Sequence, residues 1–289
     1  MGTKVVKSFG IGAVVARAAL AWIRRDPRAG QLQRTNFHGR TVTLAGGPAL
    51  AAGATFGAAF GAPSPSVAAA VITAGGAAGA VGFYDDIAGN RPDQKAAKGF
   101  AGHLSALREG RVTSGLVKIA GLGAAGLAAA ALLAGDRGVR AHQGRQDAGA
   151  LRTATDVLLG AGVIAGTANL VNLLDLRPGR ALKASVLIGT PLTAGRGGGV
   201  AAGTLGAGAA LLPSDLGEDV MLGDSGANAL GALLGVALAA RTGPGGRAVA
   251  LTILAALTAA SEKVSFTKVI QDTPWLRELD ALGRRPPQA

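Results

Sequence analysis

Two adjacent carboxylates stand where an apolar segment stops. Asp85 and Asp86 follow a long run of Ala, Gly and Val in the stretch GFYDDIAG. Neighbours in a helix point about 100° apart, so we expect one carboxylate to face a ligand and the other to support it. Negative charge at a helix C-terminus opposes the macrodipole, so the pair needs an offset such as a bound cation or a basic neighbour. The alternative is a solvated helix end that stops the apolar span.

A second polar group interrupts another apolar run. Asn169, Asn172 and Asp175 are spaced three apart, so they line one sector of a helix surface. Polar side chains inside a membrane span usually face the bundle interior or a watery cavity, which favours a binding site. The alternative is that the asparagines hydrogen-bond to neighbouring helices.

A third acidic group precedes a later apolar run. Asp224 lies in GDSG, where Ser225 is a candidate N-cap of the following helix. Asp224 is a candidate site residue, and the alternative is that it only caps the helix or faces solvent. The loop 214–225 contains several acidic residues and no basic one, namely Asp215, Glu218, Asp219 and Asp224. This acidity fits a divalent cation site, because Mg²⁺ prefers carboxylate, phosphate and water oxygens.

The remaining side chains limit the chemistry further. The chain has no cysteine, and its only histidines are His38, His103 and His142, which excludes a Cys nucleophile and a His-rich metal site. Carboxylates, amides and a metal ion suit phosphoryl transfer, where positioning and charge neutralisation do most of the work. The basic residues that could hold phosphate groups, or serve only as membrane-surface charges, are Arg40, Lys95 and Lys98.

The elements that must position these residues are membrane helices. The 289-residue chain is 49% hydrophobic and 16% charged with a mean hydropathy of +0.36, values typical of an integral membrane protein. The N-terminal segment is interpreted as a first membrane helix and not as a signal peptide, because Arg17 interrupts it and no cleavage site follows. We expect an all-α, polytopic helical bundle that forms one integral-membrane domain over residues 1–289.

Hydropathy predicts about nine transmembrane helices. Their approximate ranges are 5–23, 44–62, 66–84, 116–134, 157–174, 184–194, 200–213, 226–240 and 248–260. The sixth and seventh are separated only by GRGGG, so they either cross separately or form one broken or re-entrant element. If all nine cross, one side of the membrane has more Lys and Arg than the other, and the positive-inside rule makes that side cytoplasmic. The polar groups described above all fall on this side.

The net charge of +12 indicates which molecules the chain is expected to bind. Basic loops suit a polytopic protein beside anionic lipids, so membrane lipids are the expected partners of this charge. Nucleic acid is not an expected partner, because no aromatic-interleaved basic patch or known binding module accompanies the charge. The sequence leaves open whether the chain forms a homodimer.

Taken together, four stretches resemble a known family. They are TNFHGRTVTLAGG, GFYDDIAGN followed by KAAKGFAGH, NLVNLLDLRPG and MLGDSGANALG, and they extend from about Asn36 to Ser225. In this order the chain resembles the polyprenyl-phosphate N-acetylhexosamine-1-phosphate transferases, which include phospho-N-acetylmuramoyl-pentapeptide transferase. The resemblance implies a multi-pass enzyme of the bacterial plasma membrane that works in cell-wall and envelope glycan synthesis. It would transfer a sugar-1-phosphate from a UDP-sugar to a polyprenyl phosphate such as undecaprenyl phosphate, release UMP and require Mg²⁺, with a cytoplasmic active site.

The resemblance also implies residue roles. Asp85 and Asp86 would handle the lipid phosphate, and Asp224 would bind the metal with Asn172 near it. Lys98 would contact phosphate. From the resemblance together with the spacing of the polar residues, we expect Lys98, Asn169, Asn172 and Asp175 to bind substrate and Asp85, Asp86 and Asp224 to be catalytic.

The chain also departs from the family pattern. Leu-Arg-Pro-Gly follows Asp175 where the family has glycine and later an acidic or amide residue, so the donor sugar and nucleotide stay open. A late loop with clustered histidines is absent, which indicates a divergent member. The alternative function is a catalytically silent relative that binds a lipid-linked precursor or scaffolds envelope proteins. A transporter with Asp175 or Asp86 as proton relay is disfavoured, because the carboxylates are expected at helix ends.

Overall fold

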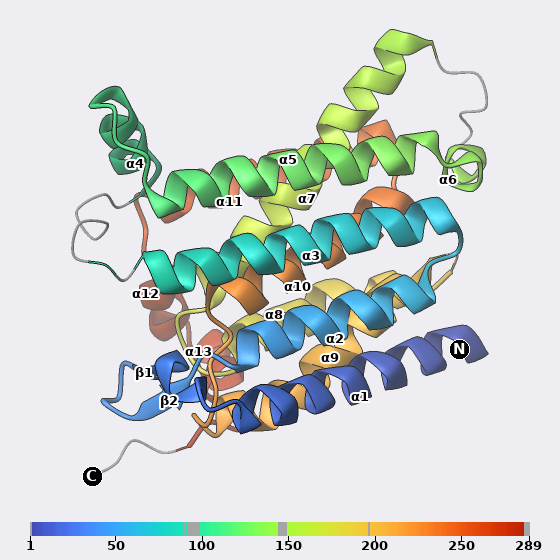
Figure 1. Cartoon of the computed structure of the whole chain (residues 1–289). Helices are drawn as coiled ribbons and strands as arrows, with labels where there is room; N and C mark the ends of the chain where they lie inside the picture. The colour runs from blue at the N-terminus through green and yellow to red at the C-terminus, as the bar shows by residue number, and fades with distance from the viewer. Residues whose placement is uncertain (1, 90, 92–98, 144–148, 196, 286–289) are drawn as a thin grey trace.

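The computed structural model describes residues 2–89, 91, 99–143, 149–195 and 197–285, and within these ranges the chain is a helical bundle with one short hairpin (Figure 1). The elements are α1 (Thr3–Arg25), η1 (Ala29–Leu32), β1 (Gln33–Thr35), β2 (Thr41–Thr43), α2 (Gly46–Gly61), α3 (Pro65–Ala88), α4 (Gly99–Arg108), α5 (Ser114–Gly135), α6 (Arg137–His142), α7 (Ala150–Leu174), α8 (Arg180–Gly189), η2 (Thr190–Thr193), α9 (Gly198–Leu216), α10 (Gly223–Arg241), α11 (Pro244–Ser261), α12 (Phe266–Asp272) and α13 (Pro274–Ala281).

Five of the described helices are long and apolar enough to cross a membrane, judged by length and composition. They are α1, α3, α5, α7 and α11. This agrees with the expectation of an all-α membrane protein. Each of the nine predicted ranges overlaps a helix, but α2 has 16 residues and α8 only 10, so nine crossings stay a prediction.

Helix α10 forms the centre of the bundle. It packs against α2, α3, α7 and α9, and 14 of its 19 residues are buried. A helix surrounded by other helices needs no apolar stripe facing lipid, so its sequence can carry polar residues that a peripheral span would exclude. Helix α10 therefore presents its N-terminus, with Asp224, to residues from several neighbouring helices.

Close helix packing depends on small residues at the crossing of α1, α2 and α9. Gly12, Gly57 and Gly203 meet there, and a β-carbon on any of the three would strike backbone atoms of a neighbouring helix. Such small residues let membrane helices approach each other closely. The alanine and glycine content thus contributes to tight packing in this bundle.

The sixth and seventh predicted spans are two separate helical segments. Helix α8 continues into η2, and the chain reverses through Gly195 and Gly197, both at positive φ, where glycine is favoured. Helix α9 then runs back along α1 and α2, starting with Gly199 against Gly61. Separate crossings by these two segments stay a prediction, because α8 has only 10 residues.

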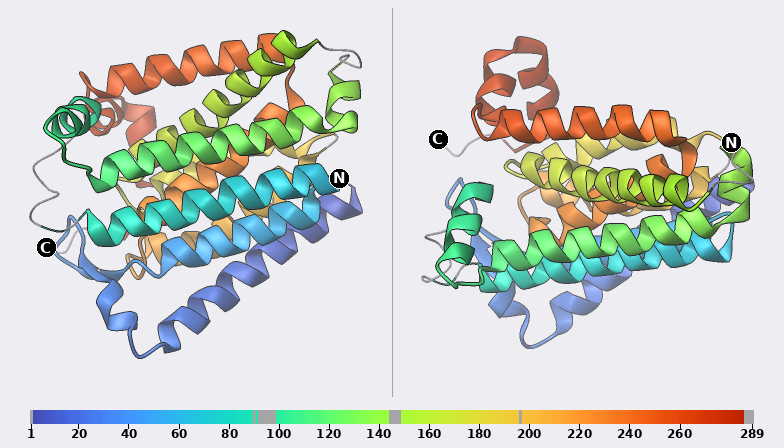
Figure 2. Two further views of the ribbon diagram at one scale, coloured as in Figure 1. Left: turned by 45° about the horizontal axis from the view of Figure 1, so that its top comes forward. Right: turned by 90° about the horizontal axis from the view of Figure 1, so that it is seen from above.

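One end of the bundle carries the polar elements. The hairpin β1–β2, α4, α12 and α13 all lie at this end, called the hairpin end below, whereas the N-terminus and α6 lie at the other (Figures 1 and 2). The antiparallel hairpin pairs Gln33 with Thr43 and Thr35 with Thr41. Thr43 also bridges to Val220, so the hairpin is fastened to the loop that precedes α10.

Candidate active site

Carboxylates from three distant parts of the chain meet at the N-terminus of α10. Asp86 lies in the last turn of α3, Asp175 follows α7 directly, and Asp224 is the second residue of α10. The backbone N–H groups of Asp224 and Ser225 donate to Asp86 at 2.9 and 3.0 Å. Gly223 N–H donates to Asp175. Three of the four unpaired N–H groups at this helix start are thus satisfied from other helices.

This arrangement corrects the prediction that Ser225 caps α10. The N-cap position is Leu222, which makes no side-chain cap hydrogen bond. The hydroxyl of Ser225 instead donates to the carbonyl of Gly79 in α3, at 2.9 Å. The physical reason is that Asp86, from another helix, already provides the acceptor oxygens that a local cap would supply.

Asp85 points to a different partner. The ammonium group of Lys118, in α5, lies 2.7 Å from Asp85 Oδ2 and 2.8 Å from Asp224 Oδ2. Lys118 is therefore the basic neighbour that offsets negative charge at the end of α3. Sequence reasoning missed this residue. The available signal was an isolated lysine inside the apolar run SGLVKIAGLGAAG.

Asp175 stands in a strongly acidic environment. Burial raises the pKa of its carboxyl well above the usual value, and the negative charges of Asp215, Asp224 and Asp86 raise it further. Nearby, Gly179 N–H donates to Asp215 at 2.6 Å and holds the loop that leads into α8. The acidic residues of the predicted loop 214–225 and the loop after α7 therefore lie together.

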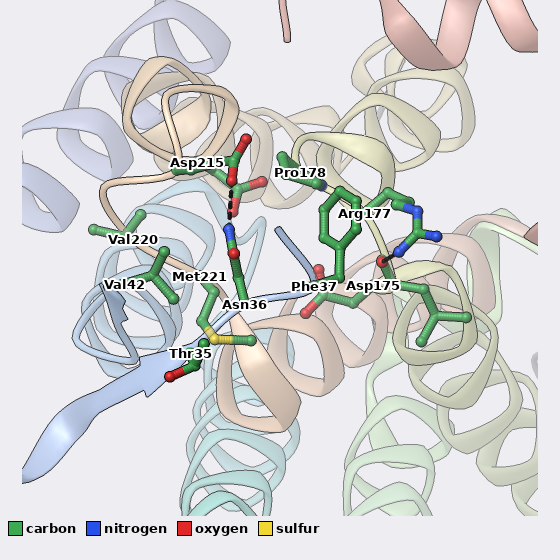
Figure 3. Close-up of a pocket in the computed structure, with 12 residues that line it drawn as sticks. Thr35, Asn36, Phe37, Val42, Asp175, Arg177, Pro178, Asp215, Val220 and Met221 are labelled. Atoms are coloured by element: carbon green, nitrogen blue, oxygen red, sulfur yellow. Dashed lines mark hydrogen bonds between the residues drawn. The ribbon is translucent and has the colours of Figure 1, made fainter. Parts of the chain in front are cut away.

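A cavity of about 190 Å³ lies between the hairpin and the loop after α7 (Figure 3). Its lining residues are Thr35, Asn36, Phe37, Val42, Asp175, Leu176, Arg177, Pro178, Asp215, Glu218, Val220 and Met221. The guanidinium of Arg177 lies 3.9 Å from the centre of the Phe37 ring, within range of a cation–π contact. The cavity combines an aromatic face, a guanidinium and carboxylates.

Glu218 fastens the tip of the hairpin beside this cavity. Its buried carboxylate accepts hydrogen bonds from Asn36 and from Arg40 at 3.2 Å, and His38 Nδ1 lies 3.0 Å away. Burial acts to raise the pKa of Glu218, but the hydrogen bonds from Asn36 and His38 outweigh it and lower the pKa. Glu218 has a φ of 55°, an uncommon conformation for a residue other than glycine. Sequence reasoning counted Glu218 only as part of an acidic loop.

Of the other predicted residues, Asn169 contacts another helix, Asn172 precedes Asp175 at the end of α7, and two lysines lie outside the described residues. Asn169 donates to Thr258 of α11 at 3.1 Å, as in the interhelical alternative. Asn172 is half-buried in the last turn of α7, and its carbonyl accepts from the N–H of Asp175. Lys95 and Lys98 lie outside the residues that the structure describes.

A magnesium ion needs several oxygen ligands. Within the described ranges, no group of three His, Cys, Asp or Glu side chains is arranged to hold a metal ion. Two carboxylates, from Asp85 and Asp224, nevertheless converge on one positive charge, that of Lys118. Hard carboxylate oxygens facing a shared cation are the ligand type that Mg²⁺ takes, usually with water and phosphate completing its shell. The oxygens are therefore of the type that Mg²⁺ binds, and the ammonium of Lys118 occupies the position that the two carboxylates share.

No protein-family model matches the chain, and no curated protein matches it either.

Proposed function

We propose that this protein is a Mg²⁺-dependent phosphoglycosyltransferase of the bacterial plasma membrane. It transfers a sugar-1-phosphate, of the N-acetylhexosamine type, from a UDP-sugar to a polyprenyl phosphate, and the hairpin end faces the cytoplasm. The observation that supports this most is the meeting of Asp85, Asp86 and Asp224 at the start of α10, with Lys118 among them. A charged cluster of this kind at the end of an apolar bundle suits a phosphorylated lipid.

In the proposed reaction an oxygen of the polyprenyl phosphate attacks the phosphorus that carries the sugar. The bond from that phosphorus to the bridging oxygen breaks, and UMP leaves with the electron pair. The products are UMP and a polyprenyl diphosphate sugar. The protein would accelerate this reaction by positioning the substrates and neutralising their charge. No covalent intermediate with the protein is required.

Each residue of the cluster has a distinct part in this proposal. Asp86 is a positioning residue, because both of its carboxylate oxygens accept backbone hydrogen bonds from α10. Asp85 and Asp224 would hold Mg²⁺ with Asn172 nearby, and the bound ion would neutralise phosphate oxygens. Lys118 supplies a fixed positive charge beside the same oxygens. The cavity with Phe37 and Arg177 is where the nucleotide-sugar would bind, since the loop after Asp175 lines it.

The proposal is tested by UMP release. Membranes containing the protein are incubated with undecaprenyl phosphate, Mg²⁺ and a panel of UDP-sugars, and UMP is measured. Asp224→Asn should abolish the release. Asp219→Asn is the matched control, because Asp219 is an exposed acidic residue of the same loop that pairs with Arg285 at 3.6 Å. Equal rates for the unmodified protein and Asp224→Asn would refute the role of the cluster.

A second candidate is a catalytically silent protein that binds polyprenyl phosphate. The ammonium of Lys118 favours it, since it stands between the two carboxylates that would otherwise share a metal ion. This candidate predicts saturable binding of undecaprenyl phosphate without Mg²⁺ and no UMP from any donor. The two measurements on the same preparation separate the candidates.

A further inference from the structure

Helix α1 contains an arginine that the proposed reaction does not use. Arg17 lies eight residues before the end of α1 at Arg25, so the helix rises about 12 Å between the two. Arg17 is exposed, and Val14, one turn before it, is 69% exposed. Helix α1 is one of the five helices suited to cross a membrane, and it lies at the edge of the bundle (Figures 1 and 2). In a bilayer its exposed face therefore meets lipid.

The helices that pack against α1 offer no carboxylate to this arginine. Neither α1 nor its neighbour α2 contains an aspartate or a glutamate. The neighbour α9 contains one carboxylate, that of Asp215, which is buried and accepts from Gly179 N–H. Among the described residues, Arg17 forms no ion pair. A charged side chain on the lipid face of a span is costly without a counter-charge, so we expect the counter-charge of Arg17 outside this chain.

A second exposed arginine lies on the same side of α1. Arg24 follows Arg17 by seven residues, which places it about 20° away around the helix and about 10.5 Å along it. Ala21 is the residue between them on this side, so no bulky side chain separates the two guanidinium groups. Arginine side chains in a span extend toward the level of the lipid phosphates, and a guanidinium binds phosphate oxygens by two parallel hydrogen bonds. Trp22, 70% exposed, lies near this level, where tryptophan is common in membrane proteins.

We propose that Arg17 and Arg24 form a binding site for the phosphate of an anionic phospholipid, in the leaflet at the hairpin end. The phosphate would lie between the two guanidinium groups, and the acyl chains would run along Val14 toward the centre of the membrane. A zwitterionic phospholipid carries a cationic group beside its phosphate, which the arginines repel. The site differs from the general attraction of basic loops to lipid, because Arg17 lies within the span. It is also separate from the carboxylate cluster and the cavity, whose described residues come from other elements.

Trp22 gives a direct measurement of the lipids beside this site, since the chain has only one other tryptophan, Trp275. The full-length Trp275→Phe protein is reconstituted in phosphatidylcholine vesicles with increasing fractions of brominated phosphatidylglycerol or brominated phosphatidylcholine. Bromine quenches tryptophan fluorescence at short range, so the two quenching curves give the ratio of the lipid binding constants near Trp22. We expect this ratio to favour phosphatidylglycerol by about fivefold for each arginine of the site.

Two variants and a matched control locate the preference, all made in the Trp275→Phe protein. Arg17→Gln and Arg24→Gln should each lower the ratio by about fivefold. Both arginines are exposed, and glutamine has nearly the same helix propensity as arginine, so the variants are expected to fold. Arg28→Gln is the control, because Arg28 is an exposed arginine that follows α1, and it should leave the ratio unchanged. In about 1 M salt the preference should persist, since the Debye length is then about 3 Å and partly buried pairs are screened much less.

Several outcomes would overturn the proposal. Equal quenching by the two brominated lipids, or an unchanged ratio in Arg17→Gln, would show that the arginines do not select an anionic lipid. An equal loss in Arg28→Gln, or a preference that disappears in salt, would assign the effect to the general surface charge and not to a site on α1. Because the measurement needs no turnover, a negative UMP assay would refute the transferase and leave the lipid site standing.

Discussion

Replacing Lys118 by methionine tests the charge balance of the carboxylate cluster. The substitution keeps an unbranched side chain and removes the ammonium that lies 2.7 Å from Asp85 and 2.8 Å from Asp224. These distances hold the two carboxylate oxygens within about 5.5 Å of each other. The two carboxylates repel by about 3 kcal/mol at an effective dielectric constant of about 20, and this repulsion, which the ammonium of Lys118 offsets, is left uncompensated when the ammonium is removed. The side chains are 12% and 25% exposed, so solvent reduces this to about 2 kcal/mol.

The assay is thermal unfolding of the purified protein in detergent at neutral pH. A loss of about 2 kcal/mol should lower the Tm by about 4 °C in a chain of this size. Asp85→Asn in the Lys118→Met background should restore most of the loss, because it removes one of the two repelling charges. Lys7→Met, at an exposed lysine of α1, is the control and should leave the Tm unchanged. An unchanged Tm for Lys118→Met, or a double variant as unstable as the single one, would refute the reasoning.

Three further predictions concern other charged groups. Arg247→Met should lower the free energy of unfolding by about 3–5 kcal/mol, because it removes one partner of the buried ion pair with Asp156, whose side chain is 3% exposed. A double variant with Asp156→Leu should recover most of this loss in denaturant titrations. Since the pKa of Glu218 is lowered, its stabilisation of the hairpin is complete above the usual value of 4.5 and is lost as the pH falls below it. Hydrogen exchange of residues 33–43, corrected for intrinsic rates, should therefore rise in acid, and Glu218→Gln should show the rise already at pH 7. Because the pKa of Asp175 is raised in the folded state, ionising this carboxyl costs stability, and the cost grows as the pH rises above the usual value of 3.8. Asp175→Asn should therefore raise the Tm at pH 8 and not at pH 4. An equal gain in Tm at both pH values would contradict this.

The amino-acid sequence alone indicated the helical class and most helix positions. The range predicted for the third span, 66–84, lies within α3, and the range 226–240 lies within α10. Hydropathy and composition are properties of neighbouring residues, so they can be read without knowing the fold. The same local patterns indicated that Asp85, Asp86 and Asp224 stand at helix ends.

The pairing of these residues was decided only by the tertiary structure. Asp86 caps a helix that begins 137 residues later, so the local pattern around Ser225 led to the wrong cap. Within its own helix Lys118 is a single charge in an apolar run. It pairs with Asp85 only because α5 packs beside α3 and α10. The physical reason is that a hydrogen bond or ion pair forms within about 3 Å, whereas the sequence specifies only which groups are available. Which groups come that close depends on how small residues let the helices pack.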